Sequence, residues 1–393
     1  MAKLIEITGK VLSGEWGTDD NAGIGVPVLR TTNFTNDGVV NYNNVVTRII
    51  SKKNIAEKYL RYGDIIIEKS GGSDSQPVGR VIFFEGAEKT YLFNNFTGLL
   101  RVQDTSKWAP KYVFYSLYAN YRRGGTKQYE NKTTGLHNLK TDNYVNCFNI
   151  DEIEITKQTH ICEQLDKVRS IIVARQQQLQ KLDELVKARF VEMFGDYLKD
   201  DRKPLSEVAI ITGGLTKNSN RNTFETKMPY LRVANVFYNR LDLREILEIG
   251  IKEEEIEKTL LQAGDLLFVE GNGSIEQIGR VAIWDGSIDP ILHQNHLIKA
   301  RFNNEIIAPE YALFYFMLQD GRQQIISKSV STSGLNTLSV NKVSSLLLPI
   351  PPITLQKQFG EFVKQVDKSK FIIQKSVDET QLLFDSLMQK YFN

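Results

Sequence analysis

The sequence contains little cysteine or histidine, and it lacks the long apolar segments that mark membrane and secreted proteins. It has two cysteines and four histidines in 393 residues. No apolar run is long enough to span a bilayer, and the N-terminus, MAKLIEITGK, lacks the apolar core of a signal peptide. Cys147 and Cys162 form no Cys-x-x-Cys pair, which is typical of a reduced compartment. We therefore expect a cytoplasmic protein with no membrane span.

Motifs for catalysis and cofactor binding are also missing. Gly124-Gly125-Thr126-Lys127 has neither the spacing nor the preceding strand of a Walker P-loop, and no third glycine follows Gly271-Asn272-Gly273 at dinucleotide spacing. There is no Gly-x-Ser-x-Gly elbow. There is also no Asn/Asp-Pro-Pro-Tyr/Phe segment, which amino-methyltransferases place against a flipped base. The sequence predicts no catalytic residue and no cofactor in this chain.

The net charge of +2 is distributed unevenly along the chain. Residues 1–150 carry a net charge of +5, whereas residues 200–350 carry −3. A protein that binds DNA through bulk electrostatics is normally more basic than this. If DNA is the ligand, the positive charge must be local or must come from a partner.

Two stretches about two hundred residues apart show the same heptad pattern. Alternating steps of three and four residues between apolar positions predict long helices that pack along another helix. The first stretch runs from about Lys157 to Phe194 and the second from near Leu355 to the end of the chain, at an apparent offset of 201 residues. The predicted seam residues are Ile161, Leu165, Val168, Ile172, Leu179, Leu182 and Val186 in the first helix, and Phe362, Val366, Ile373, Leu383 and Leu387 in the second.

The repetition extends over the whole chain, at offsets between 198 and 202 residues. In each copy a Gly-Asp turn precedes a short apolar strand, and an Ala-Pro pair precedes an aromatic stretch with helical spacing. These features predict a tandem duplication of an α+β domain followed by a long helix. The repeated pairs include Gly63-Asp64 with Gly264-Asp265, Gly79-Arg80-Val81 with Gly279-Arg280-Val281, and Ala109-Pro110 with Ala308-Pro309.

The duplication also bears on metal binding. His293 and His296 are close enough in sequence to suggest a metal site, but their counterparts are Phe93 and Phe96. No cysteine or paired carboxylate lies nearby in the sequence. We interpret both histidines as occupying aromatic positions that accept His, and we predict no metal site.

The loops differ between the two copies, whereas the repeated turn, strand and helix motifs, called the frame, are shared. They contain Arg, Lys, Asn, Gln, Ser and Thr, the side chains that hydrogen-bond to base edges and phosphates. Two different polar faces on one duplicated frame suit the reading of two different short DNA sequences, although solvated loops are the simpler alternative for any single residue. The candidate DNA-binding residues are Lys69, Ser70, Ser73, Gln76, Arg122, Arg123, Lys127, Tyr129 and Lys132 in the first copy, and Arg221, Asn222, Asn272, Ser274, Glu276, Gln277, Lys328, Ser331 and Thr332 in the second.

The order of these motifs resembles the specificity subunit, HsdS, of type I restriction–modification systems. The resemblance covers the full chain and includes the Lys-Gln pairs at the helix starts, Lys157-Gln158 and Lys357-Gln358. It implies an α+β fold in which two tandem target-recognition domains are separated by two long helices that form an antiparallel coiled coil. The implied boundaries are 1–150 and 200–350 for the recognition domains, and 151–199 and 351–393 for the spacer helices.

The resemblance also implies partners. Each domain would read one half of a bipartite site in double-stranded DNA. The helices would dock two methyltransferase subunits, which bind S-adenosylmethionine, and restriction/motor subunits would join the complex. The chain itself would be non-catalytic. Three alternatives stay open: a modification-only or phage-defence complex, a coiled-coil scaffold that binds proteins only, and an enzyme with an unrecognised site.

Overall fold

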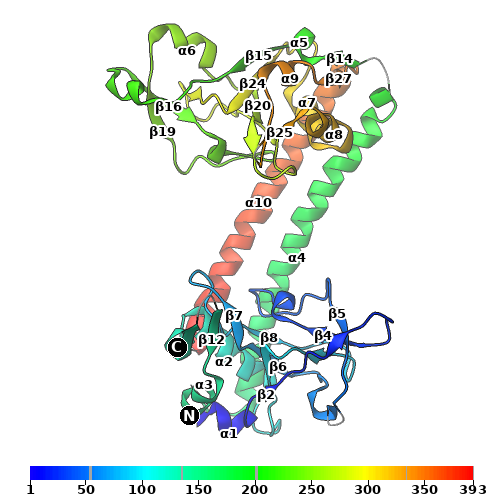
Figure 1. Ribbon diagram of the computed structural model, residues 1–393, viewed down its shortest axis with the longest axis vertical. Coiled ribbons are helices and arrows are strands. Elements are labelled where there is room, and N and C mark those ends of the chain that lie inside the picture. The colour runs from blue at the N-terminus through cyan, green and yellow to red at the C-terminus, as the bar shows by residue number, and fades with distance from the viewer. Residues whose placement is uncertain (53–54, 134–135, 200–201, 333, 393) are drawn as a thin grey trace. The chain divides into compact units, whose positions relative to one another are not determined.

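The computed structural model describes residues 1–52, 55–133, 136–199, 202–332 and 334–392 (Figure 1). The chain divides into two compact units. The first unit comprises residues 1–175 and 376–393, and the second comprises residues 176–375. Two long helices, α4 (Ile155–Phe194) and α10 (Ile353–Tyr391), each contribute one half to each unit. The predicted boundaries at 150, 199 and 350 stay predictions. The predicted second recognition domain, 200–350, begins at residues 200 and 201, which lie outside the described part of the chain.

The centre of the first unit is a four-stranded antiparallel sheet in the order β2 (Leu12–Ser13), β10 (Thr97–Leu100), β6 (Ile65–Glu68) and β8 (Val81–Phe83). A second sheet has the order β3 (Thr18–Asp19), β5 (Val46–Ile49), β4 (Val26–Leu29) and β9 (Leu92–Phe93), with β4 and β9 parallel. A third sheet places β12 (Leu136–Leu139) between β11 (Glu130–Thr133) and β7 (Ser70–Gly72). The short strands β1 (Ala2–Lys3) and β13 (Asn149–Ile150) pair with each other, and β1 contacts the helices α1 (Leu4–Thr8) and α3 (Thr141–Cys147), whereas α2 (Pro110–Arg122) packs against β8.

The second unit repeats this topology with a smaller second sheet. Its central sheet has the order β15 (Ala209–Gly213), β24 (Leu297–Phe302), β20 (Leu266–Val269) and β22 (Val281–Ile283). The other two larger sheets are β19 (Leu247–Gly250), β16 (Lys227–Leu231) and β23 (Leu292–His293), and β21 (Gly271–Asn272), β26 (Leu335–Thr337) and β25 (Val330–Thr332). The remaining strands pair as β14 (Arg202–Pro204) with β27 (Leu347–Pro349) and β17 (Val236–Phe237) with β18 (Arg240–Leu241). The shorter helices of this unit are α5 (Leu205–Val208), α6 (Glu253–Thr259), α7 (Pro309–Met317), α8 (Gln319–Lys328) and α9 (Val340–Ser344).

The repeated Gly-Asp motif builds the same buried ion pair in each unit. Asp64 accepts two hydrogen bonds from Arg101, at 2.7 Å each, and Asp265 accepts equivalent bonds from Arg301 at 2.8 and 2.7 Å. Each carboxylate is nearly fully buried, so the opposing guanidinium offsets the desolvation of its charge. The preceding glycine in each unit has a positive φ that glycine adopts at low cost. The motif therefore fixes the start of a central strand.

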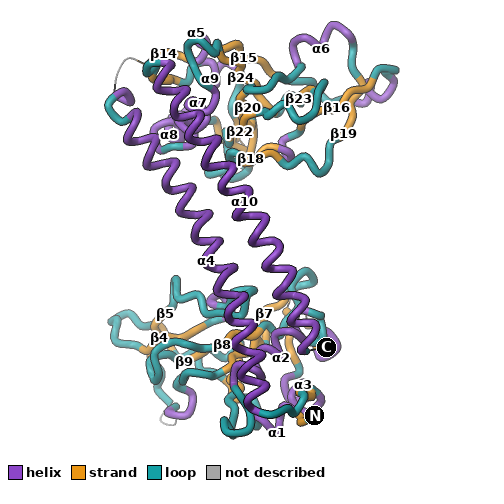
Figure 2. Tube along the Cα trace, turned by 180° about the vertical axis from the view of Figure 1, so that it is seen from behind, coloured by secondary structure: helices purple, strands orange, loops and turns teal. Residues whose placement is uncertain are grey.

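Within each unit, one half of α4 packs beside one half of α10, and the two helices run in opposite directions (Figures 1 and 2). In the first unit the Tyr391 hydroxyl donates to Gln164 Oε1 at 2.7 Å. In the second unit Lys370 pairs with Asp183 at 2.6 Å, and aromatic rings of the two helices also pack together. The early part of α4 thus meets the late part of α10, and the late part of α4 meets the early part of α10, which is an antiparallel pairing.

The buried face of α10 differs from the predicted seam. Phe384 is 5% exposed whereas Leu383 is 51% exposed, so Phe384 occupies the position predicted for Leu383. Phe362 and Leu387 are only half-buried, whereas the residues that follow them in the sequence are buried. We therefore correct the seam of α10. On α4, the buried seam residues are Ile161, Leu165, Val168, Ile172 and Val186, with Leu179 and Leu182 half-buried.

Two buried glutamines give the true register of the duplication. Gln158 donates to the carbonyls of Lys107 and Ile153 and accepts from the Ala109 amide. Gln356 donates to the carbonyls of Ile306 and Pro351 and accepts from the Ala308 amide. Gln158 and Gln356 are thus equivalent, and the offset along the helices is 198 residues, not 201. The predicted counterpart, Gln358, is exposed. A shift of three residues moves one of the two apolar heptad positions onto the other, so the apolar pattern distinguishes these offsets only weakly.

Candidate nucleic-acid interface

The first unit brings together candidate segments that are about sixty residues apart in the sequence. Strand β12 pairs with β11 on one side and with β7 on the other. This sheet therefore places Ser70 on β7 in the same layer as Lys132 on β11. Lys132 forms an ion pair with Asp74, in the loop that follows β7. Predicted residues from the 69–76 and 127–132 segments thus form one polar surface.

The side chains of the 69–76 segment are held by neighbouring polar groups. Lys69 Nζ donates to Ser13 Oγ at 2.7 Å, and burial lowers the pKa of this lysine. Gln76 Nε2 donates to Asn36 Oδ1 at 2.8 Å. Ser73 is exposed, and its hydroxyl accepts a hydrogen bond from the Gln76 amide at 3.1 Å. These contacts give the loop a defined conformation in which polar groups face solvent.

The basic cluster after α2 is less available than the sequence suggests. Arg122 forms an ion pair with Asp385 of α10 at 2.6 Å, and its guanidinium lies 5.8 Å from the ring centroid of a tyrosine one turn earlier in α2. Arg123 and Lys127 are exposed. Tyr129 packs edge-on against a second tyrosine with ring centroids 5.3 Å apart. Arg122 therefore links the recognition fold to α10, whereas Arg123 and Lys127 stay candidate phosphate contacts.

The small sheet of the second unit brings Asn272 and Ser331 together. Both residues pair with Asn336 on the middle strand, β26. Asn336 also donates to the carbonyls of Asn272 and its successor at 3.4 and 3.3 Å. Lys328 ends α8 just before this sheet. Thr332 ends β25, and its side chain lies outside the described residues. Asn272, Ser331 and Lys328 thus lie on or beside the sheet equivalent to β7–β12–β11, in which Asn336 is buried.

The 274–277 loop is held to the body of the second unit by an arginine and a tyrosine. Arg322 donates to three carbonyls of the 275–278 segment, at distances from 2.6 to 3.4 Å. The Tyr238 hydroxyl also donates to the Glu276 carbonyl. The side chains of Ser274 and Glu276 hydrogen-bond to each other, which holds the pKa of Glu276 below its usual range. Gln277 Oε1 lies 3.5 Å from a side-chain nitrogen of the repeated Gly-Arg-Val arginine.

The structure corrects the prediction that Arg221 contacts DNA. Its side chain is largely buried and forms two hydrogen bonds with Glu255, at 2.7 and 2.9 Å. It also donates to the carbonyls of Thr216 and Gly250. A guanidinium whose donors are satisfied inside the protein is not available to a phosphate. Its neighbour Asn222 is exposed. The polarity of the segment suggested an interface, but the sequence did not reveal the distant partner Glu255.

Sequence reasoning also missed the middle strand of each small sheet. His137 on β12 lies opposite residues of β7 and β11, and Asn336 on β26 lies opposite residues of β21 and β25. The two residues occupy equivalent positions, because Leu139 and Leu338 make the same backbone hydrogen bond to the residue after the central strand. The sequence signal that could have identified them is the difference between His137 and Asn336 at equivalent positions of the two copies. His137 therefore joins the candidate interface, whereas Asn336 is buried and supports the sheet through its hydrogen bonds to backbone carbonyls.

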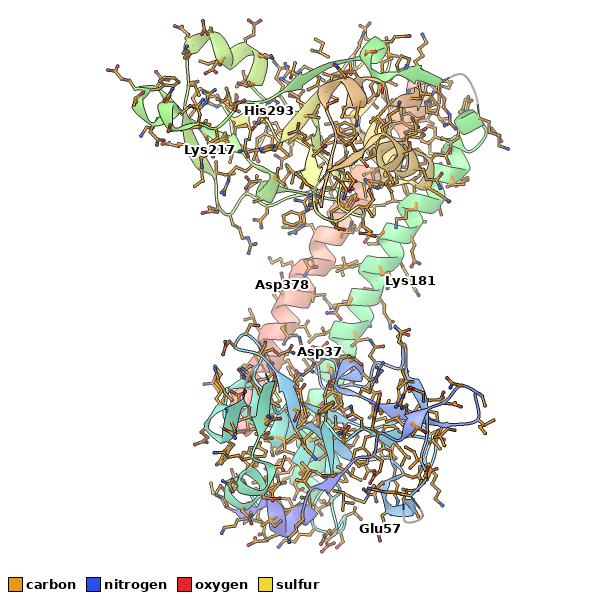
Figure 3. All side chains as sticks on the ribbon, viewed as in Figure 1. Asp37, Glu57, Lys181, Lys217, His293 and Asp378 are labelled. Atoms are coloured by element: carbon orange, nitrogen blue, oxygen red, sulfur yellow. The ribbon has the colours of Figure 1, made fainter. Side chains whose placement is uncertain are left out.

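His293 lies inside the second unit (Figure 3) and is fully buried. Its Nδ1 is 2.8 Å from the Thr259 carbonyl, and burial lowers its pKa to about 4. His296 instead pairs with Glu270 at 2.8 Å. Across the described ranges, no group of three or more His, Cys, Asp and Glu side chains is arranged to hold a metal ion. No helix in those ranges has the length and apolarity needed to cross a membrane.

Comparison with known proteins gives consistent matches. Residues 201–380 match the family described as type I restriction modification DNA specificity domain. The chain is 24% identical over 397 residues to the EcoKI type I restriction enzyme specificity subunit of Escherichia coli K12, covering 93% of this chain and 80% of that protein. It is 29% identical over 218 residues to a protein from Methanocaldococcus jannaschii that is named as the MjaX specificity subunit. That match covers 55% of this chain and only half of the relative.

The fold is also found among solved structures. The S subunit of a type I restriction–modification system from M. genitalium matches with a TM-score of 0.55 and 15% identity, over all of this chain and 95% of that one. The fold thus defines a duplicated α+β protein with two long helices, and its second unit carries a DNA specificity domain. Residues 201–380 match the type I restriction modification DNA specificity domain, and over 93% of its length the chain is similar to the EcoKI specificity subunit.

Proposed function

We propose that this chain is the DNA sequence-specificity subunit of a type I restriction–modification complex, and that each unit reads one half of a bipartite site. The observation that carries the proposal is the pair of equivalent small sheets, β7–β12–β11 and β21–β26–β25. The backbone frame is the same in both, but the polar side chains differ. They are Ser70, His137 and Lys132 in one sheet, and Asn272 and Ser331 in the other, where the middle-strand residue Asn336 is buried. Different hydrogen-bonding groups on one frame suit two different base sequences.

The chain would be non-catalytic and would position partner subunits. Exposed apolar side chains on the long helices support docking, because a soluble helix rarely leaves large apolar residues uncovered in groups. At the offset of 198, Val173 is equivalent to Phe371 and Leu185 to Leu383. Two equivalent surfaces suit two copies of one partner, so we propose two methyltransferase subunits per chain, with restriction subunits joining the assembled complex. The exposed apolar residues of the long helices are Ile171, Val173, Leu382 and Leu383 in the first unit, and Leu185, Val191, Phe371 and Ile372 in the second.

The test is to express the gene with its methyltransferase subunit in a host without adenine methylation, and to map methylated adenines across the genome. We expect one bipartite motif that disappears when this gene is deleted. A scaffold that binds only proteins would leave the methylation pattern unchanged on deletion, which would overturn the proposal. Cutting of unmethylated DNA after addition of the restriction subunit would separate restriction from the modification-only alternative.

The stoichiometry has its own measurement. Native mass spectrometry should find two methyltransferase subunits bound to each chain. Replacing both Phe371 and Ile372, which are exposed, by serine should leave one bound subunit. Lys368→Ser on the same helix is the control: Lys368 is also exposed but is not apolar, so this variant should retain both subunits. Retention of both subunits in the double variant would contradict docking at these residues.

A further inference from the structure

Three arginines in the second unit surround two adjacent aromatic rings. Phe237 ends strand β17 and Tyr238 follows it. The Arg240 and Arg280 guanidiniums lie 4.6 and 5.1 Å from the Phe237 ring centroid, and the Arg322 guanidinium lies 5.4 Å from that of Tyr238. These five residues are called the arginine–aromatic cluster. Cation–π contact holds the planar guanidiniums in place without neutralising their charge.

No ion pair to a carboxylate is formed by Arg240, Arg280 or Arg322 within the residues that the structure describes. Arg280 donates to the Val233 carbonyl at 2.9 Å, and Arg322 to carbonyls of the 275–278 segment. Burial lowers the pKa of Arg280 and of Arg322, yet an arginine stays protonated in proteins. The cluster is therefore a concentration of positive charge without a directly paired carboxylate, and Asp242, which pairs with Arg244, has only a Coulombic interaction with Arg240.

The first unit shows what is unusual about this arrangement. Arg80 is the counterpart of Arg280, and Glu68 pairs with it through hydrogen bonds of 2.8 and 3.0 Å. Counting from the aspartate of the Gly-Asp motif in each unit, the residue equivalent to Glu68 is Val269, which has no charge. The second unit thus keeps the half-buried arginine but lacks its carboxylate. A protein that retains a half-buried cation without a partner carries a desolvation cost, which an external anion would offset.

The cluster also lies beside the candidate interface. Arg322 and Tyr238 both hydrogen-bond to the Glu276 carbonyl, and Arg280 contacts Gln277. Both acceptors belong to the 274–277 loop, whose backbone leads from the small sheet β21–β26–β25. A phosphate on the cluster would therefore lie next to side chains that face base edges. This local charge resolves the difficulty that residues 200–350 carry a net charge of −3.

We propose that the arginine–aromatic cluster binds a DNA backbone phosphate, and that Arg240, the exposed member, is the contact that brings DNA onto the second unit. Arg280, which contacts the Phe237 ring, and Arg322, which contacts the Tyr238 ring, add further positive charge, and Arg322 also positions the 274–277 loop. This inference rests on the proposed function, because it takes double-stranded DNA as the ligand. It goes beyond that function by naming the residues through which an acidic domain binds the phosphate backbone.

The test measures DNA affinity of the assembled methyltransferase complex against salt concentration, by fluorescence anisotropy with a labelled duplex of mixed sequence. Arg240→Gln should weaken binding and reduce the slope of log affinity against log salt by about 0.9, the contribution of one phosphate contact. Arg240 is exposed and contacts the Phe237 ring, so the variant should fold. Arg240→Lys keeps the charge and should retain most of the slope.

Arg244→Gln is the matched control. It removes the same charge four residues away, but Arg244 is already paired with Asp242 at 2.6 Å, so the slope should stay unchanged. An unchanged slope in Arg240→Gln, or an equal reduction in Arg244→Gln, would overturn the cluster as the phosphate site while leaving the proposed function intact. Failure of the unmodified complex to bind the duplex at all would instead count against the proposed function.

Discussion

The buried histidine of the second unit should make its stability depend on pH, and replacement by its natural counterpart should remove that dependence. His293 on β23 pairs with Leu231, and Phe93 on β9 pairs with Leu29 in the same register of the first unit. The His293 and Phe93 side chains are both fully buried. His293→Phe therefore installs a ring that the duplicated frame already accommodates at the equivalent position.

The magnitude follows from the pKa of the histidine in the two states. Burial lowers it from 6.5 to about 4 in the folded protein, whereas the unfolded chain keeps the ordinary value. As the pH falls below 6.5, the unfolded state takes up a proton before the folded state does, so the free energy of unfolding decreases. The loss is complete near pH 4 and amounts to about 3 kcal/mol, at about 1.36 kcal/mol for each pKa unit.

The assay is urea unfolding of the full chain at a series of pH values, followed by tryptophan fluorescence. Trp284 is 1% exposed and lies in the second unit, so it reports on the region around His293. Other titrating groups are common to both proteins and cancel in the difference between their unfolding free energies. That difference should shift by about 3 kcal/mol in favour of His293→Phe as the pH falls from 6.5 to about 4. Parallel pH profiles would refute the assignment of a neutral, buried imidazole.

Two further substitutions test the corrected side-chain roles. Arg221→Ala should destabilise the second unit by about 2–3 kcal/mol, because it leaves Glu255 and two carbonyls without their donor. The control, Arg244→Ala, should leave the unfolding midpoint in urea unchanged. Equal effects of the two substitutions would refute the structural role of Arg221. Gln356→Leu should lower the free energy of unfolding by about 3 kcal/mol, since it leaves the Ala308 amide and two carbonyls unpaired. Gln358→Leu, at an exposed position, should be nearly neutral. A larger effect of Gln358→Leu than of Gln356→Leu in the same unfolding assay would contradict the offset of 198.

Local signals in the sequence predicted the frame well. The Gly-Asp turns, the Ala-Pro helix starts and the heptads are short-range patterns, and the structure places a central strand, a helix and a long helix at each of them. The α+β duplication followed from their repetition. The Asp64–Arg101 and Asp265–Arg301 pairs explain why the Gly-Asp motif occurs twice, but the sequence could not reveal the arginine partners, because each lies more than thirty residues away.

The candidate site was less predictable, because a side chain's availability depends on distant partners. Arg221 and Arg122 look like free cations in the sequence, yet carboxylates from other segments pair with them. Arg280 belongs to the repeated frame, and only the loss of the Glu68 equivalent distinguishes it from its counterpart. The register of α10 was ambiguous for a different reason: a three-residue shift still superposes one apolar heptad position on the other.

The central claim, that each unit reads one half of a bipartite DNA site independently, is tested most directly by exchanging one recognition domain. Residues 204–348 would be replaced by the equivalent region of a relative with a different methylated motif, and the methylated adenines of the host genome would then be mapped. The exchanged region contains the second unit's own central sheet and its own buried ion pair. The account therefore predicts a motif in which one half changes and the other half is retained. A motif altered in both halves would contradict it.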